Sequence, residues 1–285
     1  MAGMNANWPL LKDLNLSCNN LTASAMSYLT QLSWTKIAIL DLTYNPKLDS
    51  KAIEKLAAGS WPCLRSLAIH GSFGLKYFVQ VAASSWPLLE TVDVQCAYCP
   101  PRAVSFAGFA PNARELSIVT FCPPVKQGTF GMPAVSGLTQ PHWPNLQTLD
   151  LRCSHLGSAG IMQLSVGRWP LLSKLDLTQV QQHSTLPPWV YARLAQGNWP
   201  QLTYLSLAGH RMDDDCAAEL VNADWPKLQT LDLVQNHITT DGCARLAQGN
   251  WPDLKNICLH APIGTMQFSL SFRLNKSIGS SALRR

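Results

Sequence analysis

A Trp-Pro pair recurs along the chain at a nearly constant spacing. It occurs eight times, at Trp8, Trp61, Trp86, Trp143, Trp169, Trp199, Trp225 and Trp251. Trp34-Thr35 and Ala110-Pro111 fill two gaps as degenerate copies, so that ten starts follow one another at intervals of 24 to 33 residues. Self-similarity at such a period is the sequence signature of a repeat architecture. The chain is therefore predicted to stack about ten similar units.

Each unit contains a strand pattern followed by a helix pattern. In the unit that starts at Trp225, Leu231 and Leu233 alternate with polar residues, as on a strand with one buried face. Apolar residues at helical spacing follow up to Leu246, and Gly249 suits the left-handed residue that ends many helices. The proline of the next Trp-Pro pair stops the helix from continuing.

Stacking of such units places the strands side by side in one parallel sheet, with the helices on its other side. The sequence predicts ten strands, centred on Leu14–Leu16, Leu40–Leu42, Leu67–Ile69, Val92–Val94, Leu116–Ile118, Leu149–Leu151, Leu175–Leu177, Leu205–Leu207, Leu231–Leu233 and Ile257–Leu259. The tryptophans are expected to be buried spacers on the helix side.

An asparagine follows several strands, at Asn19, Asn45 and Asn236, where its amide can bond the backbone of the turn. Other residue types occupy the same slot elsewhere, so we expect the resulting ladder to be broken; they are Ala97, Ser154, Val180 and His210.

The L-x-x-L-x-L-x-x-N segments, such as the one running from Leu228 to Asn236, resemble the leucine-rich-repeat superfamily and, within it, the ribonuclease-inhibitor-like class. The resemblance implies an α/β fold: a right-handed leucine-rich-repeat solenoid (horseshoe) with a parallel sheet on the concave face and helices on the convex face. It covers residues 8 to about 260, and the solenoid is assigned to residues 1–260. Such repeats serve inhibitors, ubiquitin-ligase substrate receptors and immune sensors, so the resemblance implies protein binding rather than catalysis.

The pattern is irregular at 97–142, which contains two Cys-Pro-Pro runs, and at 179–189, which ends in Leu186-Pro187-Pro188-Trp189. Both stretches follow a strand and should emerge on one edge of the solenoid, as partner-binding loops or as decayed repeats. Residues 261–285 alternate apolar and polar side chains from Met266 to Leu274 and hold four cations and no acid. They are interpreted as a C-terminal cap strand or a basic tail.

Exposed strand residues are expected five, seven and nine positions after each unit start. The middle column holds five aspartates, Asp41, Asp93, Asp150, Asp176 and Asp232. Leu-Asp-Leu is either the mere consensus of the repeat or an acidic stripe that binds a basic segment of a partner. The candidate partner-binding residues are these five aspartates with Tyr204, Arg152 and Trp189; His70 and Lys174 also flank the column.

Composition argues against several other classes of protein. The formal net charge is +5, but four of the positive charges lie in residues 261–285, whereas a nucleic-acid-binding solenoid would carry them along its repeats. No run approaches the roughly 18 apolar residues of a membrane span. No secretion signal is visible, so the nine cysteines are interpreted as reduced thiols of a cytoplasmic protein. Neither a nucleic acid nor a membrane is expected as a partner.

No catalytic motif occurs, and no cofactor is expected. Cys96 and Cys99 form a lone C-x-x-C that Cys122 and His142 could complete only at a spacing unusual for zinc, so no metal site is assigned. The aspartates recur by repeat geometry rather than converge on a pocket, so the chain is not expected to be an enzyme.

Two functions remain. The first is a non-catalytic protein-binding scaffold that uses the concave face and the loop edge. The alternative is the substrate-receptor part of a ubiquitin ligase; residues 1–7 leave no room for an F-box-like module, which would then be missing from this chain.

Overall fold

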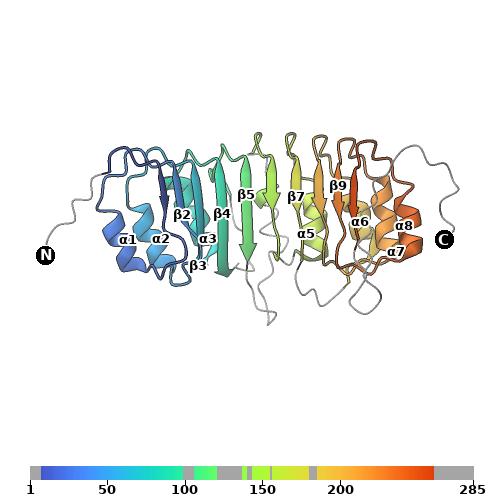
Figure 1. The fold of residues 1–285 in the computed structure, drawn as a ribbon, viewed down its shortest axis with the longest axis horizontal. Helices are drawn as coiled ribbons and strands as arrows, with labels where there is room; N and C mark the ends of the chain where they lie inside the picture. The colour runs from blue at the N-terminus through green and yellow to red at the C-terminus, as the bar shows by residue number, and fades with distance from the viewer. Residues whose placement is uncertain are drawn as a thin grey trace.

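Ten parallel strands form one open sheet in chain order (Figure 1). The structure is a computed structural model and describes residues 8–98, 106–120, 137–139, 143–154, 156–179 and 185–259, with backbone only at 97, 98 and 120. The strands are β1 (Asp13–Asn15), β2 (Ile39–Leu42), β3 (Ser66–Gly74), β4 (Thr91–Tyr98), β5 (Glu115–Thr120), β6 (Thr148–Asp150), β7 (Lys174–Asp176), β8 (Tyr204–Ser206), β9 (Thr230–Asp232) and β10 (Asn256–Cys258). The predicted parallel sheet and its strand positions are confirmed.

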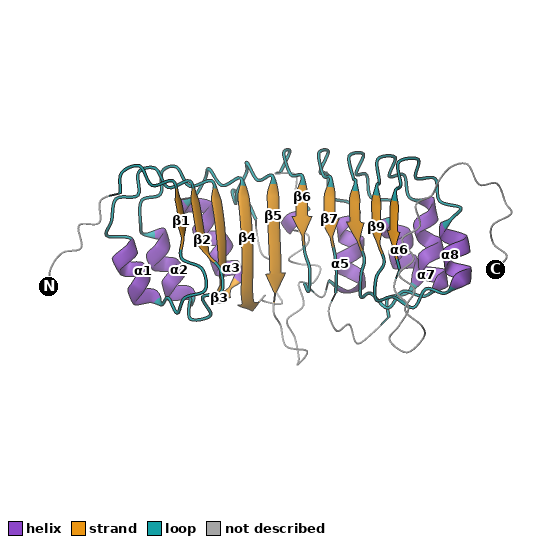
Figure 2. Ribbon diagram, in the orientation of Figure 1, coloured by secondary structure: helices purple, strands orange, loops and turns teal. Residues whose placement is uncertain are grey.

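The helices cover one face of this sheet. They are α1 (Ala23–Leu29), α2 (Ser50–Ala57), α3 (Leu75–Ser85), α5 (Gly157–Leu164), α6 (Pro188–Leu194), α7 (Asp214–Glu219), the 3₁₀ turn η1 (Leu220–Asn222) and α8 (Thr240–Leu246). Figure 2 shows them behind the sheet, and none of the described helices lies on the face toward the viewer. We call this uncovered face the strand face.

One repeated backbone arrangement fixes the step from each strand to the next. The carbonyl of Lys12, just before β1, accepts the N–H groups of both Ala38 and Ile39 at 2.8 and 3.0 Å. The equivalent carbonyl does the same at every later step, ending at Gln229, which accepts from Lys255 and Asn256. Because all the steps match, residues at equivalent positions of neighbouring units lie side by side.

The leucines of the strand pattern form the core between the sheet and the helices. Leu149, Leu175, Leu205 and Leu231 are fully buried, and so are the leucines that begin the pattern, Leu146, Leu172, Leu202 and Leu228. In the first unit Leu11, Leu14 and Leu16 are only partly buried, because β2 is the single neighbour of β1 among the described strands.

The tryptophans form a buried column on the helix side, as predicted. Trp169 packs on Trp199 with ring centroids 6.4 Å apart, and Trp199 packs on Trp225 at 6.2 Å. The exposed fractions of Trp143, Trp169, Trp199 and Trp225 are 2% or less. At the start of the chain Trp8 is 56% exposed because only Trp34 stacks on it.

Phenylalanines continue the column where the sequence lacks a tryptophan. Phe106 and Phe109 are buried, and Phe109 contacts Phe78 while Phe106 contacts Trp143, with ring centroids 6.1 and 5.7 Å apart. The carbonyl of Phe109 accepts the indole N–H of Trp143 at 3.1 Å. The degenerate unit at Ala110-Pro111 therefore keeps its spacer, supplied by residues just before the expected start.

Parts of the two irregular stretches are described. Within 97–142, strand β5 pairs with β4 and β6, at the position that the repeat predicts for a strand. Within 179–189, Pro188 and Trp189 already belong to α6, because proline suits the first turn of a helix, where no N–H is needed. The remaining parts of these stretches, and residues 261–285, lie outside the described residues.

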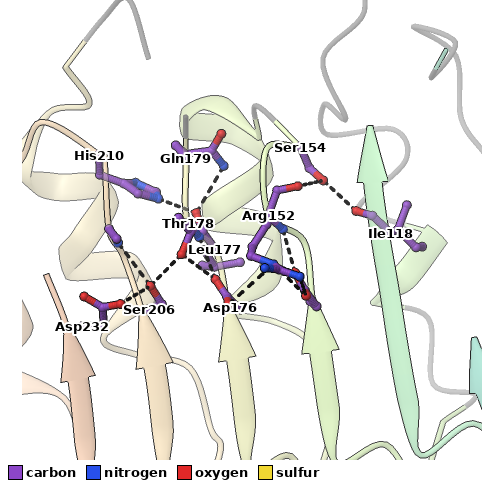
Figure 3. A network of polar contacts seen from close by, with 12 residues as sticks. Ile118, Arg152, Ser154, Asp176, Leu177, Thr178, Gln179, Ser206, His210 and Asp232 are labelled. Carbon is purple, nitrogen blue, oxygen red and sulfur yellow. Dashed lines mark hydrogen bonds and ion pairs between the residues drawn. The ribbon is translucent and has the colours of Figure 1, made fainter. Parts of the chain in front are cut away.

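The expected break in the asparagine ladder is wrong at two positions. Asn45 and Asn236 donate to the carbonyls of Leu16 and Leu207 in the preceding unit, each at 2.9 Å. Ser154 donates to the equivalent carbonyl of Ile118 at 2.9 Å, and His210 contacts that of Leu177 at 2.8 Å (Figure 3). In these two units a serine and a histidine contact the carbonyl that an asparagine contacts elsewhere.

Candidate functional site on the strand face

The five aspartates lie in one row across the strand face, as predicted from the repeat. Cα pairing aligns Asp41 with Ala68 and Ala68 with Asp93, and it places Asp150 beside Asp176. Asp232 follows one strand further on, after Ser206. We call this row, from Asn15 to Cys258, the aspartate column.

A backbone hydrogen bond explains why aspartate recurs in the column. Asp41 accepts the N–H of Thr43 at 2.9 Å, and Asp232 accepts that of Val234 at 3.1 Å. Asn15 does the same for Ser17 at 2.9 Å. Short polar side chains that bond the backbone two residues on are typical of turns. In five units the residue that follows the bonded N–H has a backbone conformation in the left-handed region. These residues are Cys18, Tyr44, Cys153, Gly209 and Gln235.

Arg152 contacts both adjacent aspartates, and Figure 3 shows its side chain reaching toward Asp176. Its Nη2 is 2.8 Å from Oδ2 of Asp150, and its Nε is 3.9 Å from Oδ2 of Asp176. The side chains of Asp150 and Asp176 are 11% and 9% exposed. Burial raises the pKa of Asp176, and the charge of Asp150 adds to that shift, against the hydrogen bonds from Thr178 and the charge of Arg152. These two carboxylates are already paired within the chain.

The polar network continues from Asp176 toward the C-terminus. The hydroxyl of Thr178 donates to Asp176 at 2.6 Å and lies 2.8 Å from that of Ser206. Ser206 in turn donates to Asp232 at 3.3 Å. Tyr204 lies beside this network with the ammonium of Lys174 5.3 Å from its ring centre. Burial, followed by the charges of Asp176 and Asp232, raises the pKa of the Tyr204 hydroxyl.

A second cluster lies near the N-terminal end of the strand face. Nε2 of His70 is 3.5 Å from Oδ2 of Asp93, and the ring of Tyr44 meets that of His70 edge-on with centroids 5.2 Å apart. Burial raises the pKa of Asp93, but hydrogen bonds from His70 and Ser117 outweigh it, so the pKa lies below its usual value. Tyr44 is 66% exposed and was missed by sequence reasoning, because it follows the strand in a turn.

Trp189 does not belong to this surface. It lies in the first turn of α6 and is 51% exposed, whereas Arg152, Tyr204 and the aspartates lie on the strand face. The structure therefore brings together seven of the eight predicted partner-binding residues as members of one face and places the eighth on a helix.

A pocket of about 370 Å³ interrupts the tryptophan column between Trp61 and Trp86. Trp61 donates its indole N–H to the carbonyl of Leu56 across a three-residue connection, but α3 runs directly into Trp86 without such a connection. The indole N–H of Trp86 is buried and has no hydrogen-bond partner among the described residues. Helix α3 therefore reaches Trp86 without the residues that separate α2 from Trp61.

Within the described ranges no three or more His, Cys, Asp or Glu side chains gather as metal ligands would. Cys99, Cys122 and His142, considered above for zinc, fall outside those ranges. None of the described helices combines the length and apolar character needed to cross a bilayer.

Comparison with known proteins agrees with the repeat. A family model described as leucine-rich repeat matches residues 9–29, 142–165 and 226–247. Comparison with curated proteins gives no match. Among solved structures, the yeast complex of Rad7 and Elc1 contains a chain with a TM-score of 0.51 at 16% identity, covering 87% of this chain and 69% of that one. A protein from Bacteroides fragilis gives 0.51 at 13% identity, covering 87% and 73%.

These similarities show the fold alone, because both identities are low. The family model matches three of the units, and the ten-stranded parallel sheet with its buried leucines repeats the same strand pattern along the described chain. The chain therefore has the fold of a leucine-rich-repeat solenoid.

Proposed function

We propose that the chain is a non-catalytic protein-binding scaffold whose partner contacts the strand face. The observation that carries the proposal is the uncovered face itself, which crosses ten strands and carries polar side chains tied to their own backbone. Side chains that are already ordered lose little conformational entropy when a partner binds. Rigid repeats commonly use such extended surfaces for binding.

The charge of the face favours a basic partner segment. The described positions five, seven and nine residues after the unit starts hold seven carboxylates and two cations, a net charge of −5 on a chain whose total is +5. The carboxylates are Asp13, Asp41, Asp93, Glu115, Asp150, Asp176 and Asp232. Charge complementarity of this kind mainly sets specificity and the rate of association.

Affinity capture with three forms of the full chain tests the proposal. The strand-face variant carries Asp150→Asn and Asp176→Asn, which keep the turn bond that Asn15 also makes. The matched control carries Asp215→Asn and Asp241→Asn, which remove two carboxylates from α7 and α8 on the helix side. Proteins retained by the wild type and the control but lost by the strand-face variant support the proposal, with a weaker dependence of binding on salt. Identical sets from all three forms contradict it.

The alternative proposal is a substrate-receptor subunit of a ubiquitin ligase, with the ligase-binding module missing from this chain. Its support is the similarity to a chain solved in the complex of Rad7 and Elc1. Ligase subunits that purify with the chain at fixed stoichiometry, and ubiquitin transfer to a captured partner, would distinguish it from a simple scaffold.

A further inference from the structure

The two halves of the strand face differ in whether lysine or arginine side chains accompany their carboxylates. In β6–β9 the chain itself supplies Arg152 and Lys174. In β1–β5 the three strand-face positions of each unit include Asp13, Asp41, Asp93 and Glu115 but no lysine or arginine. The cations Arg65 and Arg114, near the start of these strands, are both held by Glu90. The N-terminal half therefore carries most of the net negative charge.

Asp41 and Asp93 lie on opposite sides of Ala68 in the aspartate column. Two strand spacings separate their backbones, which is about 9.6 Å. Ala68 has the smallest side chain in the aspartate column, so it occupies little of the space between the two carboxylates itself. No ion pair among the described residues reaches Asp41, whereas Asp93 has the imidazole of His70 and the hydroxyl of Ser117 as partners.

On the other half of the face, one guanidinium already contacts two carboxylates of the aspartate column. There Arg152 spans from Asp150 to Asp176, with contacts of 2.8 and 3.9 Å. Those aspartates are on adjacent strands, and the arginine comes from the chain itself. A planar guanidinium presents donors on opposite edges, so one group can serve two carboxylates at once. Around Ala68 no residue in the described part of the chain plays that role.

An aromatic ring completes the surroundings. Tyr44 is 66% exposed and rests edge-on against His70, whose own side chain is 15% exposed and bonds Asp93. Cations bind favourably over exposed aromatic rings, as Lys174 does over Tyr204 in this chain. Ile39, 44% exposed in β2, adds an apolar contact next to Asp41.

We propose that Asp41 and Asp93, one on each side of Ala68, bind a single arginine side chain of a partner protein, with the ring of Tyr44 beside it. The proposal rests on the proposed function, since it names the contact that a strand-face partner makes. A lysine fits less well, because an ammonium is a compact charge that cannot reach both carboxylates in a fixed plane.

A probe peptide tests the site without knowledge of the partner. The full chain, labelled at its alanine and isoleucine methyl groups, is titrated with acetyl-Gly-Gly-Arg-Gly-Gly-amide and with peptides holding lysine or uncharged citrulline in place of the arginine. We expect the arginine peptide to shift the methyl signals of Ala68 and Ile39, the lysine peptide to bind several-fold more weakly, and the citrulline peptide to leave both signals in place.

The Asp41→Asn and Asp93→Asn double variant should bind the arginine peptide about fivefold to tenfold more weakly, the loss expected for exposed charge-assisted contacts. An asparagine in place of Asp41 would keep the bond to the N–H of Thr43, as Asn15 does for Ser17, so folding should be retained. The control Asp224→Asn and Asp253→Asn, with both acids exposed outside the strand face, should bind like the wild type.

Unchanged methyl signals in the wild type, or equal binding by wild type and the Asp41/Asp93 variant, would overturn the arginine site. Such a result leaves the scaffold proposal standing if the Asp150/Asp176 variant loses partners in affinity capture. If instead the peptide binds as expected while captured proteins ignore every strand-face substitution, the scaffold proposal falls, and with it the assignment of the arginine to a partner protein.

Discussion

Nε2 of His210 lies 2.8 Å from the carbonyl oxygen of Leu177 in the preceding unit. A carbonyl only accepts, so Nε2 carries the hydrogen, and Nδ1 is left to accept from the hydroxyl of Tyr191 at 3.4 Å. The imidazole is completely buried, and burial lowers its pKa to about 4 despite the bond to Leu177. His210 is thus a neutral structural group in a slot that Asn236 fills one unit later.

This burial predicts a stability that falls in acid. The ordinary histidine pKa is 6.5, so between pH 6.5 and 4 the unfolded chain binds a proton that the folded chain does not. The contribution of His210 is complete above pH 6.5, and about 2–3 kcal/mol of unfolding free energy should be lost by pH 4.5. His210→Asn should remove that share of the loss. Urea unfolding of both forms at pH 7.5 and 4.5 measures it; equal losses in the two forms would contradict the assignment.

Trp169→Ala should lower the free energy of unfolding by about 3–5 kcal/mol, as large aromatic truncations in cores do. Trp169 is 1% exposed and stacks on Trp199. Trp8→Ala is the matched control, since Trp8 is 56% exposed at the end of the same column, and we expect it to cost about 1 kcal/mol or less. Chemical denaturation of both variants gives the comparison, and a loss below about 1 kcal/mol for Trp169→Ala would show that the column is not core.

Gly209→Ala should destabilise the chain more than Gly108→Ala. Both glycines lie in the left-handed region, with φ of 72° and 73°. A Cβ at Gly209 would meet the carbonyl oxygen of Gln179 at 2.0 Å, whereas a Cβ at Gly108 would meet nothing within 4 Å. Gly108→Ala should cost about 1 kcal/mol, from backbone conformation alone, and Gly209→Ala at least twice that. Thermal unfolding compares them, and equal costs would mean that the backbone moves aside at Gly209.

Hydrogen exchange should be faster in residues 8–30 than in 143–154 and 156–179. In the part of the chain that the structure describes, β1 pairs with β2 alone, and Leu14 and Leu16 are partly buried. By contrast, β6 and β7 have neighbours on both sides and fully buried leucines. Amides at the free end of a stack open with less free energy than those in its middle. Equal protection factors across both spans would indicate that something covers the N-terminal edge.

The sequence predicts most of the fold because the same physical requirement recurs in every unit. Alternating leucines such as Leu149 and Leu151 locate each strand, and Trp-Pro locates each spacer. The pattern does not identify a residue of another type that fills the same physical role. Phe109 stands one residue before the expected start, and His210 matches asparagine only in reaching the carbonyl of Leu177.

The candidate site is predicted only in part for a related reason. Register alone places Asp41 and Asp93 in one row, so the column could be read from the repeat. The pairing of side chains could not be predicted from the repeat, because whether Arg152 reaches Asp176 depends on rotamers and on neighbouring side chains. Tyr44 follows its strand in a left-handed turn, and no periodic pattern indicates its contact with His70.

At each step, from Lys12 to Gln229, two N–H groups bond one carbonyl, and this keeps the spacing between neighbouring strands of the solenoid constant. Every strand advances the surface by one fixed interval, so the distance between two contacts on a partner translates into a whole number of units. Replacing a side chain on one strand changes the surface at that strand and leaves the positions of the other side chains unchanged. The contacts that such a solenoid makes with a partner can therefore be changed one strand at a time, while the backbone keeps the spacing between strands.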